Sequence, residues 1–193
     1  MIKICIIGNA GSGKSTLAGK LFSALKPSGV NVELVPEFIR NDIQINGPMQ
    51  SVWEQYRTRF SQKEIEDSLP PSVDYAVIDS GTLTPFFYTC LYSNKENERE
   101  RLVLQDMYKF FLDDIYKRRY DYVFFLPRAK TYAANPNILT DGTRYQSVDE
   151  IETLETHMNL FFGNLHKLSN IHVLNCELDE RLGTVLEIIG YKG

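Results

Sequence analysis

The sequence has few of the residues that build disulfide-rich or metal-binding proteins. Its 193 residues include three cysteines and three histidines. Cys5, Cys90 and Cys176 form no Cys-x-x-Cys pair and are odd in number, which favours buried thiols over redox or metal-binding groups. His157, His166 and His172 show no metal-ligand spacing. The sequence therefore indicates neither a disulfide framework nor a zinc site.

Long apolar runs and a basic excess are also absent. No stretch approaches the ~20 apolar residues that a membrane-spanning helix needs, and the first residues resemble a core strand rather than a signal peptide. The net charge of −4 gives no broad basic face for a nucleic-acid backbone. With 43% hydrophobic and 24% charged residues, we expect one cytoplasmic globular domain over residues 1–193.

One motif stands out near the N-terminus. Residues 8–15 match Gly-x-x-x-x-Gly-Lys-[Ser/Thr], with an apolar run at 2–7 before them and helical apolar spacing at 16–25 after them. This order of strand, glycine turn and helix directs backbone N–H groups and a helix N-terminus at a phosphate. Lys14 is expected to reach the β and γ phosphates and the Ser15 hydroxyl to bind Mg²⁺. The predicted nucleotide-binding residues are Gly8, Asn9, Ala10, Gly11, Ser12, Gly13, Lys14, Ser15 and Thr16.

The remaining pattern alternates short strands with helices. Strands are predicted at residues 2–7, 30–35, 73–78, 122–126 and 171–174. Helices are predicted at 16–25, around 53–60, and at 83–92, 98–119, 147–168 and 179–189, the fifth starting with a capping box. Such alternation predicts an α/β fold with a five-stranded parallel sheet between helical layers. The carboxyl ends of the strands then meet at one edge, where ligands bind.

Two carboxylates directly follow strands at that edge. Glu37 is the candidate base that orients an acceptor hydroxyl and takes its proton, although it could instead favour a helix start. Arg40 could clamp the acceptor or form a structural ion pair. Asp79 ends an apolar strand, as a Walker B acid does, and is the candidate Mg²⁺ ligand; turn formation is the alternative.

A long polar segment at residues 128–146 has the features of a lid. Arg128, Lys130 and Arg144 flank it, and an arginine brought in by closure would neutralise charge on the transferring phosphoryl group. We prefer Arg144 to Arg128 as the catalytic arginine, because Asp141 begins a tight turn before it. The alternative is a solvated basic loop.

The segment 41–69 lies between the second and third strands and is interpreted as a substrate-side insertion. Trp53, Tyr56 and Arg57 are candidate substrate-binding residues, which could stack on a base and hold a phosphate. Their spacing also fits a plain amphipathic helix. Farther on, the basic run 117–119 is interpreted as a helix C-terminus that balances the helix dipole.

Taken in order, these motifs resemble the NadR-like P-loop ATPase family, which includes ribosylnicotinamide kinase domains, and the wider nucleoside and nucleotide kinases. The resemblance implies strand order 2-3-1-4-5, ATP as phosphoryl donor and Mg²⁺ as cofactor. It also implies that Glu37 or Asp79 activates the acceptor, that Arg40 lies on the substrate side and that Arg144 belongs to the lid. The sequence departs from the family after Asp79, where relatives commonly have an arginine and this chain has Ser80.

The function expected from these residues is a kinase. It would move the γ-phosphoryl group of Mg-ATP to a hydroxyl or phosphate of a nucleoside, nucleotide or nucleoside-like small molecule. One alternative is a nucleic-acid kinase that acts on a polynucleotide end or on a hydroxylated base in DNA. A second is a nucleotide-hydrolysing switch or assembly ATPase, disfavoured because residues 94–97 lack the Asp of a base-reading Asn-Lys-x-Asp motif. The sequence gives no prediction of oligomeric state.

Overall fold

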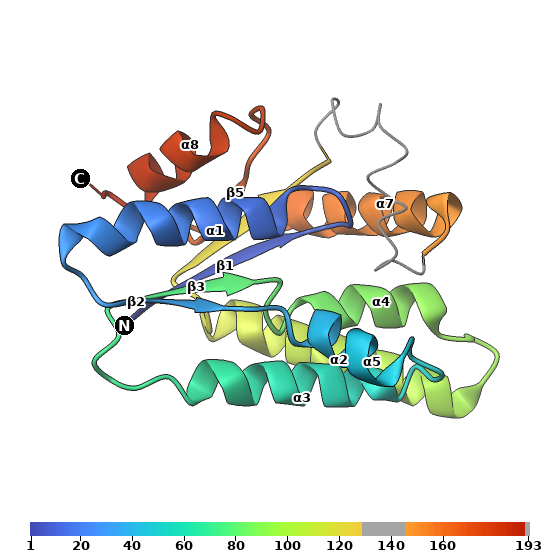
Figure 1. Ribbon diagram of the computed structural model, residues 1–193. Coiled ribbons are helices and arrows are strands. Elements are labelled where there is room, and N and C mark those ends of the chain that lie inside the picture. The colour runs from blue at the N-terminus through green and yellow to red at the C-terminus, as the bar shows by residue number, and fades with distance from the viewer. Residues whose placement is uncertain (129–145, 192–193) are drawn as a thin grey trace.

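The fold is built on one parallel sheet, seen in a computed structural model that describes residues 1–128 and 146–191 (Figure 1). The strands hydrogen-bond in the order β2-β3-β1-β4-β5. This confirms the expected five-stranded sheet and its strand order. The strands are β1 (Ile2–Gly8), β2 (Val32–Val35), β3 (Tyr75–Asp79), β4 (Tyr122–Leu126) and β5 (Ile171–Val173).

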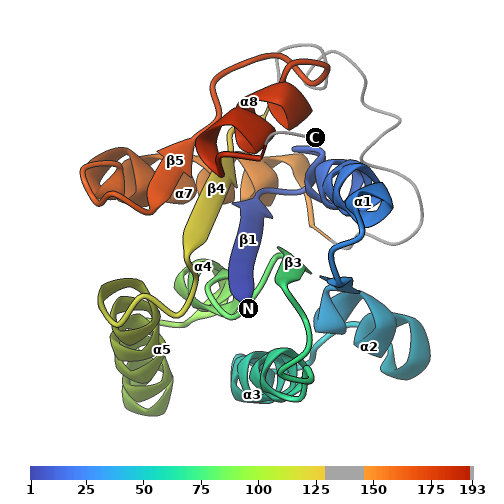
Figure 2. The ribbon, with the colours of Figure 1, turned by 90° about the vertical axis from the view of Figure 1, so that its left-hand side faces the viewer.

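Helices cover both faces of the sheet. One layer contains α1 and α8, and the other contains α3, α4, α5 and α7 (Figure 2). None of the helices within the described residues has the length and apolarity needed to cross a membrane. The helices are α1 (Lys14–Leu25), the 3-10 helix η1 (Lys26–Ser28), α2 (Phe38–Asn46), α3 (Glu54–Asp67), α4 (Thr84–Tyr92), α5 (Glu98–Tyr116), α7 (Val148–Leu165) and α8 (Arg181–Ile188).

The central strand β1 is buried on both sides, which explains its nearly continuous apolar sequence. Ile4 and Ile6 pack into the core under α1 and α8. Cys5 and Ile7 point to the opposite core, under the other helical layer. Side chains alternate along a strand, so successive residues contribute to different cores. The sheet is therefore packed on both faces up to the end of β1, where the motif at residues 8–15 begins. We call the turn within this motif the glycine loop.

The helix α7 begins where its sequence predicts. Ser147 Oγ accepts a hydrogen bond from Glu150 N at 3.2 Å, and Glu150 Oε2 accepts one from Ser147 N at 2.7 Å. This reciprocal capping box satisfies two N–H groups that the first helical turn leaves free. It places α7 beside the carboxyl edge of the sheet and confirms the predicted start.

The helix α2 was not predicted from the sequence. It has nine residues, and its one buried residue is Asp42. Its apolar residues Ile39 and Ile43 line a cavity rather than the core. Nine residues are fewer than the window in which helical periodicity can be recognised, so α2 is hard to predict although its apolar residues lie on one face. The segment 41–69 therefore contains the end of α2 and all of α3, which includes the helix predicted around residues 53–60.

The C-terminal end of α3 is tied to the sheet by charge. Asp67 accepts hydrogen bonds from Lys63 and, at 2.9 Å, from Arg119, and it lies 3.4 Å from Lys3 Nζ in β1. Partial burial alone would raise the pKa of Asp67, but the hydrogen bonds from Lys63 and Arg119 outweigh it and lower the pKa to about 2. These contacts lie at the end of the sheet opposite the glycine loop.

Candidate active site

The glycine loop has the backbone shape that its glycines were expected to allow. Gly11 and Gly13 have φ angles of +73° and +88°, a region that side chains disfavour. A Cβ atom on Gly8 would lie 2.6 Å from the Leu126 carbonyl oxygen on β4. The loop therefore passes closer to its neighbours than any other residue at position 8 would permit.

The loop ends at the N-terminus of α1, whose first helical residue is Lys14. The N-cap is Gly13, which has no side chain to cap the helix, and the first turn contains no acidic residue. The positive end of the helix dipole and its N–H groups thus face the loop without a competing carboxylate. Lys14 Nζ donates to the Asn9 carbonyl oxygen at 3.2 Å, which holds the ammonium group across the loop. This arrangement suits a phosphate chain.

Two sets of side-chain hydrogen bonds connect the loop to other elements. Asn9 donates through Nδ2 to the Ile151 carbonyl oxygen of α7 at 2.5 Å. Arg181 of α8 donates to the carbonyl oxygens of Ser12 at 2.5 Å, Pro127 at 2.8 Å and Cys176 at 3.3 Å. The sequence analysis did not identify Arg181, because nothing in its neighbourhood indicates contact with residues so distant in the chain.

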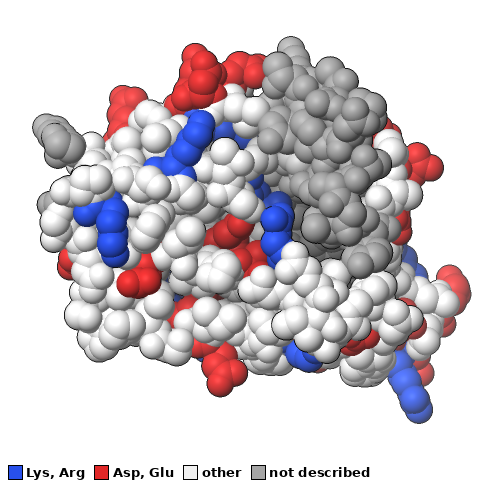
Figure 3. Space-filling model, viewed as in Figure 1, with Lys and Arg blue, Asp and Glu red and all other residues white. Residues whose placement is uncertain are grey.

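A cavity of about 710 Å³ opens beside the loop. Figure 3 shows the hollow, in which acidic and basic side chains lie near one another. Its walls come from the glycine loop, the start of α2, residues 48–52, α3, the turn after β3, α4 and the start of α7. Among the lining residues are Gly11, Gly13, Lys14, Ser15, Thr16, Glu37, Arg40, Gln55, Gln62, Ser80, Gly81, Tyr88, Tyr92, Glu100 and Glu150.

Glu37 lines this cavity together with Lys14 and Ser15. It is the N-cap residue of α2, yet its side chain makes no capping hydrogen bond. Instead, Gln62 of α3 accepts a hydrogen bond from Phe38 N at 2.8 Å. Within the described residues, the Glu37 side chain thus lines the cavity without capping α2, an arrangement compatible with contact to a ligand there.

Asp79 is the last residue of β3 and is 7% exposed. It pairs with Ile6 of β1 in the sheet, two residues before Gly8. Within the described residues, its buried Oδ1 atom has no hydrogen-bond partner. A buried carboxylate oxygen normally has a partner, so this atom fits the role of a metal or metal-water ligand.

The residues present suit Mg²⁺ bound together with a nucleotide. Ser15, in the first turn of α1, and Asp79, at the end of β3, supply oxygen donors, and oxygen is the ligand that Mg²⁺ prefers. In the part of the chain that the structure describes, no group of three or more His, Cys, Asp or Glu side chains could hold a metal. A cation here would thus need phosphate and water oxygens as well.

The predicted basic residues are placed differently from one another. Arg40 is exposed and lines the cavity. Arg128 does not line it within the described residues; its backbone N donates to Glu155 Oε1 of α7 at 3.0 Å. Lys130 and Arg144 lie outside the described residues. Arg128 therefore lies two residues after β4 and beside α7, and it is not among the described residues that line this cavity.

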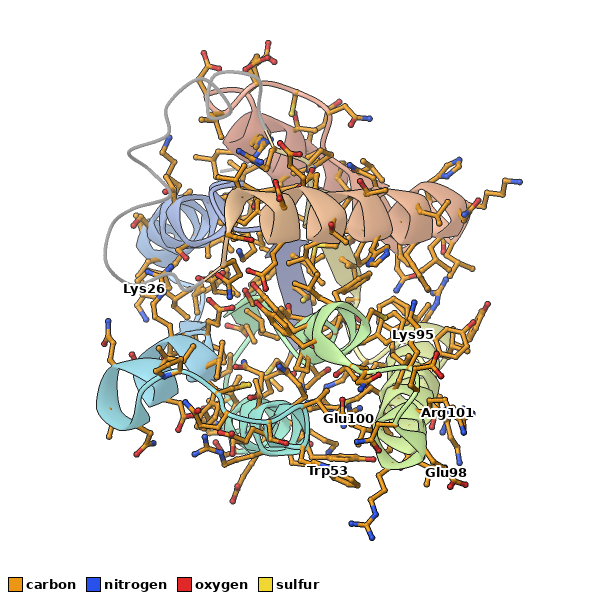
Figure 4. All side chains as sticks on the ribbon, turned by 90° about the vertical axis from the view of Figure 1, so that its right-hand side faces the viewer. Lys26, Trp53, Lys95, Glu98, Glu100 and Arg101 are labelled. Carbon is orange, nitrogen blue, oxygen red and sulfur yellow. The ribbon has the colours of Figure 1, made fainter. Side chains whose placement is uncertain are left out.

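The three expected acceptor contacts on α3 are not on the cavity wall. Trp53 is 48% exposed and lies at the outer side of α3 (Figure 4), where it stacks on Tyr56. Tyr56 donates to Asp106 at 2.7 Å, and burial with this hydrogen bond raises its pKa to about 12. Arg57 forms an ion pair with Asp42 at 2.6 Å. A plain amphipathic helix does not describe α3 either, because it leaves Trp53 and Phe60 exposed and buries polar residues. Three of these buried residues, Gln55, Thr58 and Gln62, line the cavity.

The basic run 117–119 also differs from its expected role. Lys117 caps α5 and pairs with Asp113, as a helix C-terminus would. Arg119, however, donates to the fully buried Glu66 at 2.9 and 3.1 Å. Lys117 therefore serves the helix dipole, whereas Arg119 binds a buried carboxylate and the exposed Arg118 donates to Ser169 Oγ.

Comparison with known proteins agrees with the loop and the sheet. Residues 3–168 match the family model described as an AAA domain. The chain belongs to this family. No curated protein matches the sequence of this AAA-domain chain.

Several solved structures share the fold. NadR protein in complex with NR has 18% identity and a TM-score of 0.73, with 99% of this chain covering 52% of that one. Deoxyadenosine kinase from M. mycoides has 14% identity and a TM-score of 0.66, over 99% of this chain and 100% of that one. Thymidylate kinase from Candida albicans has 16% identity and a TM-score of 0.63, over 98% and 91%. The chain spans about half the length of the NadR chains it matches.

Proposed function

We propose that this protein is a kinase that transfers the γ-phosphoryl group of Mg-ATP to a hydroxyl of a nucleoside or nucleoside-like small molecule. The proposal depends mainly on one observation: the phosphate-binding loop and Glu37, whose carboxylate does not cap α2, line the same cavity. Its volume of about 710 Å³ lies within the range of roughly 300–1,000 Å³ typical of small-molecule sites.

In this proposal the chain binds and orients both substrates. The loop amides and Lys14 bind the triphosphate, and Mg²⁺, held by Ser15 and Asp79, would neutralise charge on the phosphates. Glu37 orients the acceptor hydroxyl. The oxygen of the acceptor hydroxyl forms a bond to the γ-phosphorus, and the bond between the γ-phosphorus and the β,γ-bridging oxygen breaks. ADP leaves, and the hydroxyl proton passes to Glu37. A positioned base contributes about 10²–10⁴-fold to such reactions.

The charges around the cavity favour an acceptor without a phosphate of its own. Of its described lining residues, the cations are Lys14 and Arg40, and Lys14 belongs to the ATP side. The anions are Glu37, Glu100 and Glu150. A phosphate dianion would meet one exposed arginine and three carboxylates, and like charges disfavour each other. We therefore propose a nucleoside rather than a nucleoside monophosphate as acceptor.

Proteins of the same fold support this class of reaction. Structures that share the fold are of a NadR protein with NR, a NadR protein with NAD and AMP-PNP, and a deoxyadenosine kinase. Thymidylate kinase, which acts on a nucleotide, shares the fold as well. The fold alone thus leaves the acceptor open, and the cavity charges carry the choice between a nucleoside and a nucleotide.

The test is a product assay with Mg-ATP and a panel of nucleosides, nucleoside monophosphates, nicotinamide riboside and modified oligonucleotides. We expect a phosphorylated nucleoside, detected by mass spectrometry. A phosphorylated oligonucleotide formed with affinity that collapses as salt rises would support the nucleic-acid alternative instead. ADP formation that no acceptor accelerates would contradict a kinase and favour a nucleotide-hydrolysing switch.

A further inference from the structure

A buried polar cluster lies beneath the acceptor side of the cavity, and we call it the Glu66 network. The exposed fraction is 0% for Glu66, 1% for Tyr120, 2% for Thr82 and 3% for Gln62. Polar groups so far from water are costly unless they are hydrogen-bonded. The network consists of Gln62, Glu66, Thr82, Asp114, Arg119 and Tyr120.

Glu66 is the centre of the network. Its Oε2 accepts hydrogen bonds from Arg119 Nε and Nη2 at 3.1 and 2.9 Å. The Tyr120 hydroxyl lies 3.1 Å from both carboxylate oxygens, and Gln62 Nε2 lies 3.3 Å from Oε1. Burial raises the pKa of Glu66, although Arg119 opposes this shift. Separate segments of the chain thus meet at one side chain.

One end of the network holds the turn that follows Asp79. Thr82 N donates to the Tyr120 hydroxyl at 2.8 Å, and Thr82 Oγ1 donates to Asp114 at 2.8 Å. A Cβ atom on Gly81 would lie 2.7 Å from the Tyr120 hydroxyl, and Ser80 has a φ angle of +72°. The turn therefore follows the hydroxyl closely and adopts a backbone shape that local preference would not select.

The other end holds the helix that carries Glu37. Gln62 donates to Glu66 through Nε2 and accepts from Phe38 N through Oε1. Phe38 is the first residue of α2, directly after Glu37. The network consequently runs without a break from the backbone beside one candidate catalytic carboxylate to the turn beside the other.

We propose that Glu66 and Tyr120 are positioning residues that hold Glu37 and the Asp79 turn at a fixed spacing across the cavity. This inference rests on the proposed function. A displacement of about 1 Å between reacting groups can cost about 10²-fold in rate. The glycine loop is supported separately, by Arg181 of α8 from the opposite helical layer and by Asn9, which bonds to α7 and, within the described residues, to no member of the network. Loss of the network should thus affect phosphoryl transfer and leave ATP binding intact.

The first variant is Tyr120→Phe, which removes the hydroxyl that contacts both Glu66 and Thr82. We expect kcat to fall about 10- to 100-fold, while the Kd for ATP measured without Mg²⁺, to which Asp79 makes no contribution, changes less than about twofold. The matched control is Thr89→Val. Thr89 is equally buried, and its hydroxyl donates to the Pro85 carbonyl oxygen within α4, outside the network. The control should keep the wild-type kcat.

An unchanged kcat in folded Tyr120→Phe would overturn the proposal. A parallel loss of kcat and ATP affinity would overturn it too, since that result marks general destabilisation. If Tyr120→Phe does not fold, Glu66→Gln decides by the same two measurements, because it keeps the size of the side chain and one carbonyl acceptor.

A measurement that needs no acceptor separates this proposal from the proposed function. Amide hydrogen exchange should become faster in Tyr120→Phe at Thr82, which contacts the lost hydroxyl, and at Phe38, which lies at the far end of the network. Unaltered exchange at Phe38 would refute the linkage. If the wild-type protein phosphorylates no acceptor, the proposed function fails, and the exchange result still decides whether the two ends are coupled.

Discussion

The substitution Gly8→Ala tests whether close packing of the glycine loop is what makes it a phosphate site. The added Cβ would lie 2.6 Å from the Leu126 carbonyl oxygen, whereas ordinary contacts begin at 3.4 Å, so the loop must shift by about 0.8 Å. Overpacking of this kind costs roughly 1–3 kcal/mol. For a chain of this size each kcal/mol corresponds to roughly 2–4 °C, so we expect Tm to fall by about 2–12 °C.

The same shift should weaken ATP binding. Amide-to-phosphate hydrogen bonds are about 2.7–3.2 Å long, and an added 0.8 Å moves a donor beyond bonding distance. One hydrogen bond to a charged group is worth about 1.5–3 kcal/mol. We therefore expect the Kd for Mg-ATP, measured by isothermal titration calorimetry, to rise at least about tenfold.

The control is the same chemical change farther along, inside α1. A Cβ atom on Gly19 would have no other atom within 4 Å. In a helix interior Ala is favoured over Gly by roughly 0.5–1 kcal/mol, so Gly19→Ala should raise Tm by about 1–4 °C and leave ATP affinity unchanged. A Gly8→Ala protein with wild-type Tm and wild-type affinity would refute the packing argument, and the control shows whether the assay resolves shifts of this size.

Four further substitutions test the remaining roles. Lys14→Ala should abolish transfer, because the ammonium group contacts the transferring phosphate in the proposed complex; residual activity above a few per cent would speak against that contact. Glu37→Gln should lower kcat about 10²-fold or more with ATP affinity unchanged, whereas the loss in Asp79→Asn should shrink at high Mg²⁺; the reverse pattern would exchange their roles. Asp67 has its pKa lowered to about 2, so its stabilising effect is present above the unfolded-state pKa of 3.8 and is lost as pH falls toward 2. Asp67→Asn should accordingly flatten the decline of Tm between pH 4 and pH 2, and an equally steep decline would contradict the assignment.

Local signals explain what the sequence predicted correctly. The glycine loop, the capping box at Ser147 and the strand 122–126 depend on residues a few positions apart, and all are found where the pattern places them. Because parallel strands end at one edge, the position of Glu37 soon after β2 also predicted that it would lie near the loop, and both line the cavity.

The missed features depend on contacts between distant residues. Glu66 and Tyr120 are 54 positions apart, and Arg181 and Ser12 are 169 apart, so no periodicity reports them. Trp53 was an attractive candidate because aromatic residues bind bases, yet the direction in which α3 faces the cavity depends on packing against α4 and α5. Residue types alone do not show which side of a helix faces a ligand.

The contacts of Arg181 bear on how the chain can be shortened or extended. One guanidinium group connects the carbonyl oxygens of Ser12, Pro127 and Cys176, which come from three different parts of the sequence. A lysine has a single charged nitrogen and could not reproduce this fork. The helix α8 thus stabilises the glycine loop through Arg181, and a deletion that begins before residue 181 would remove these hydrogen bonds.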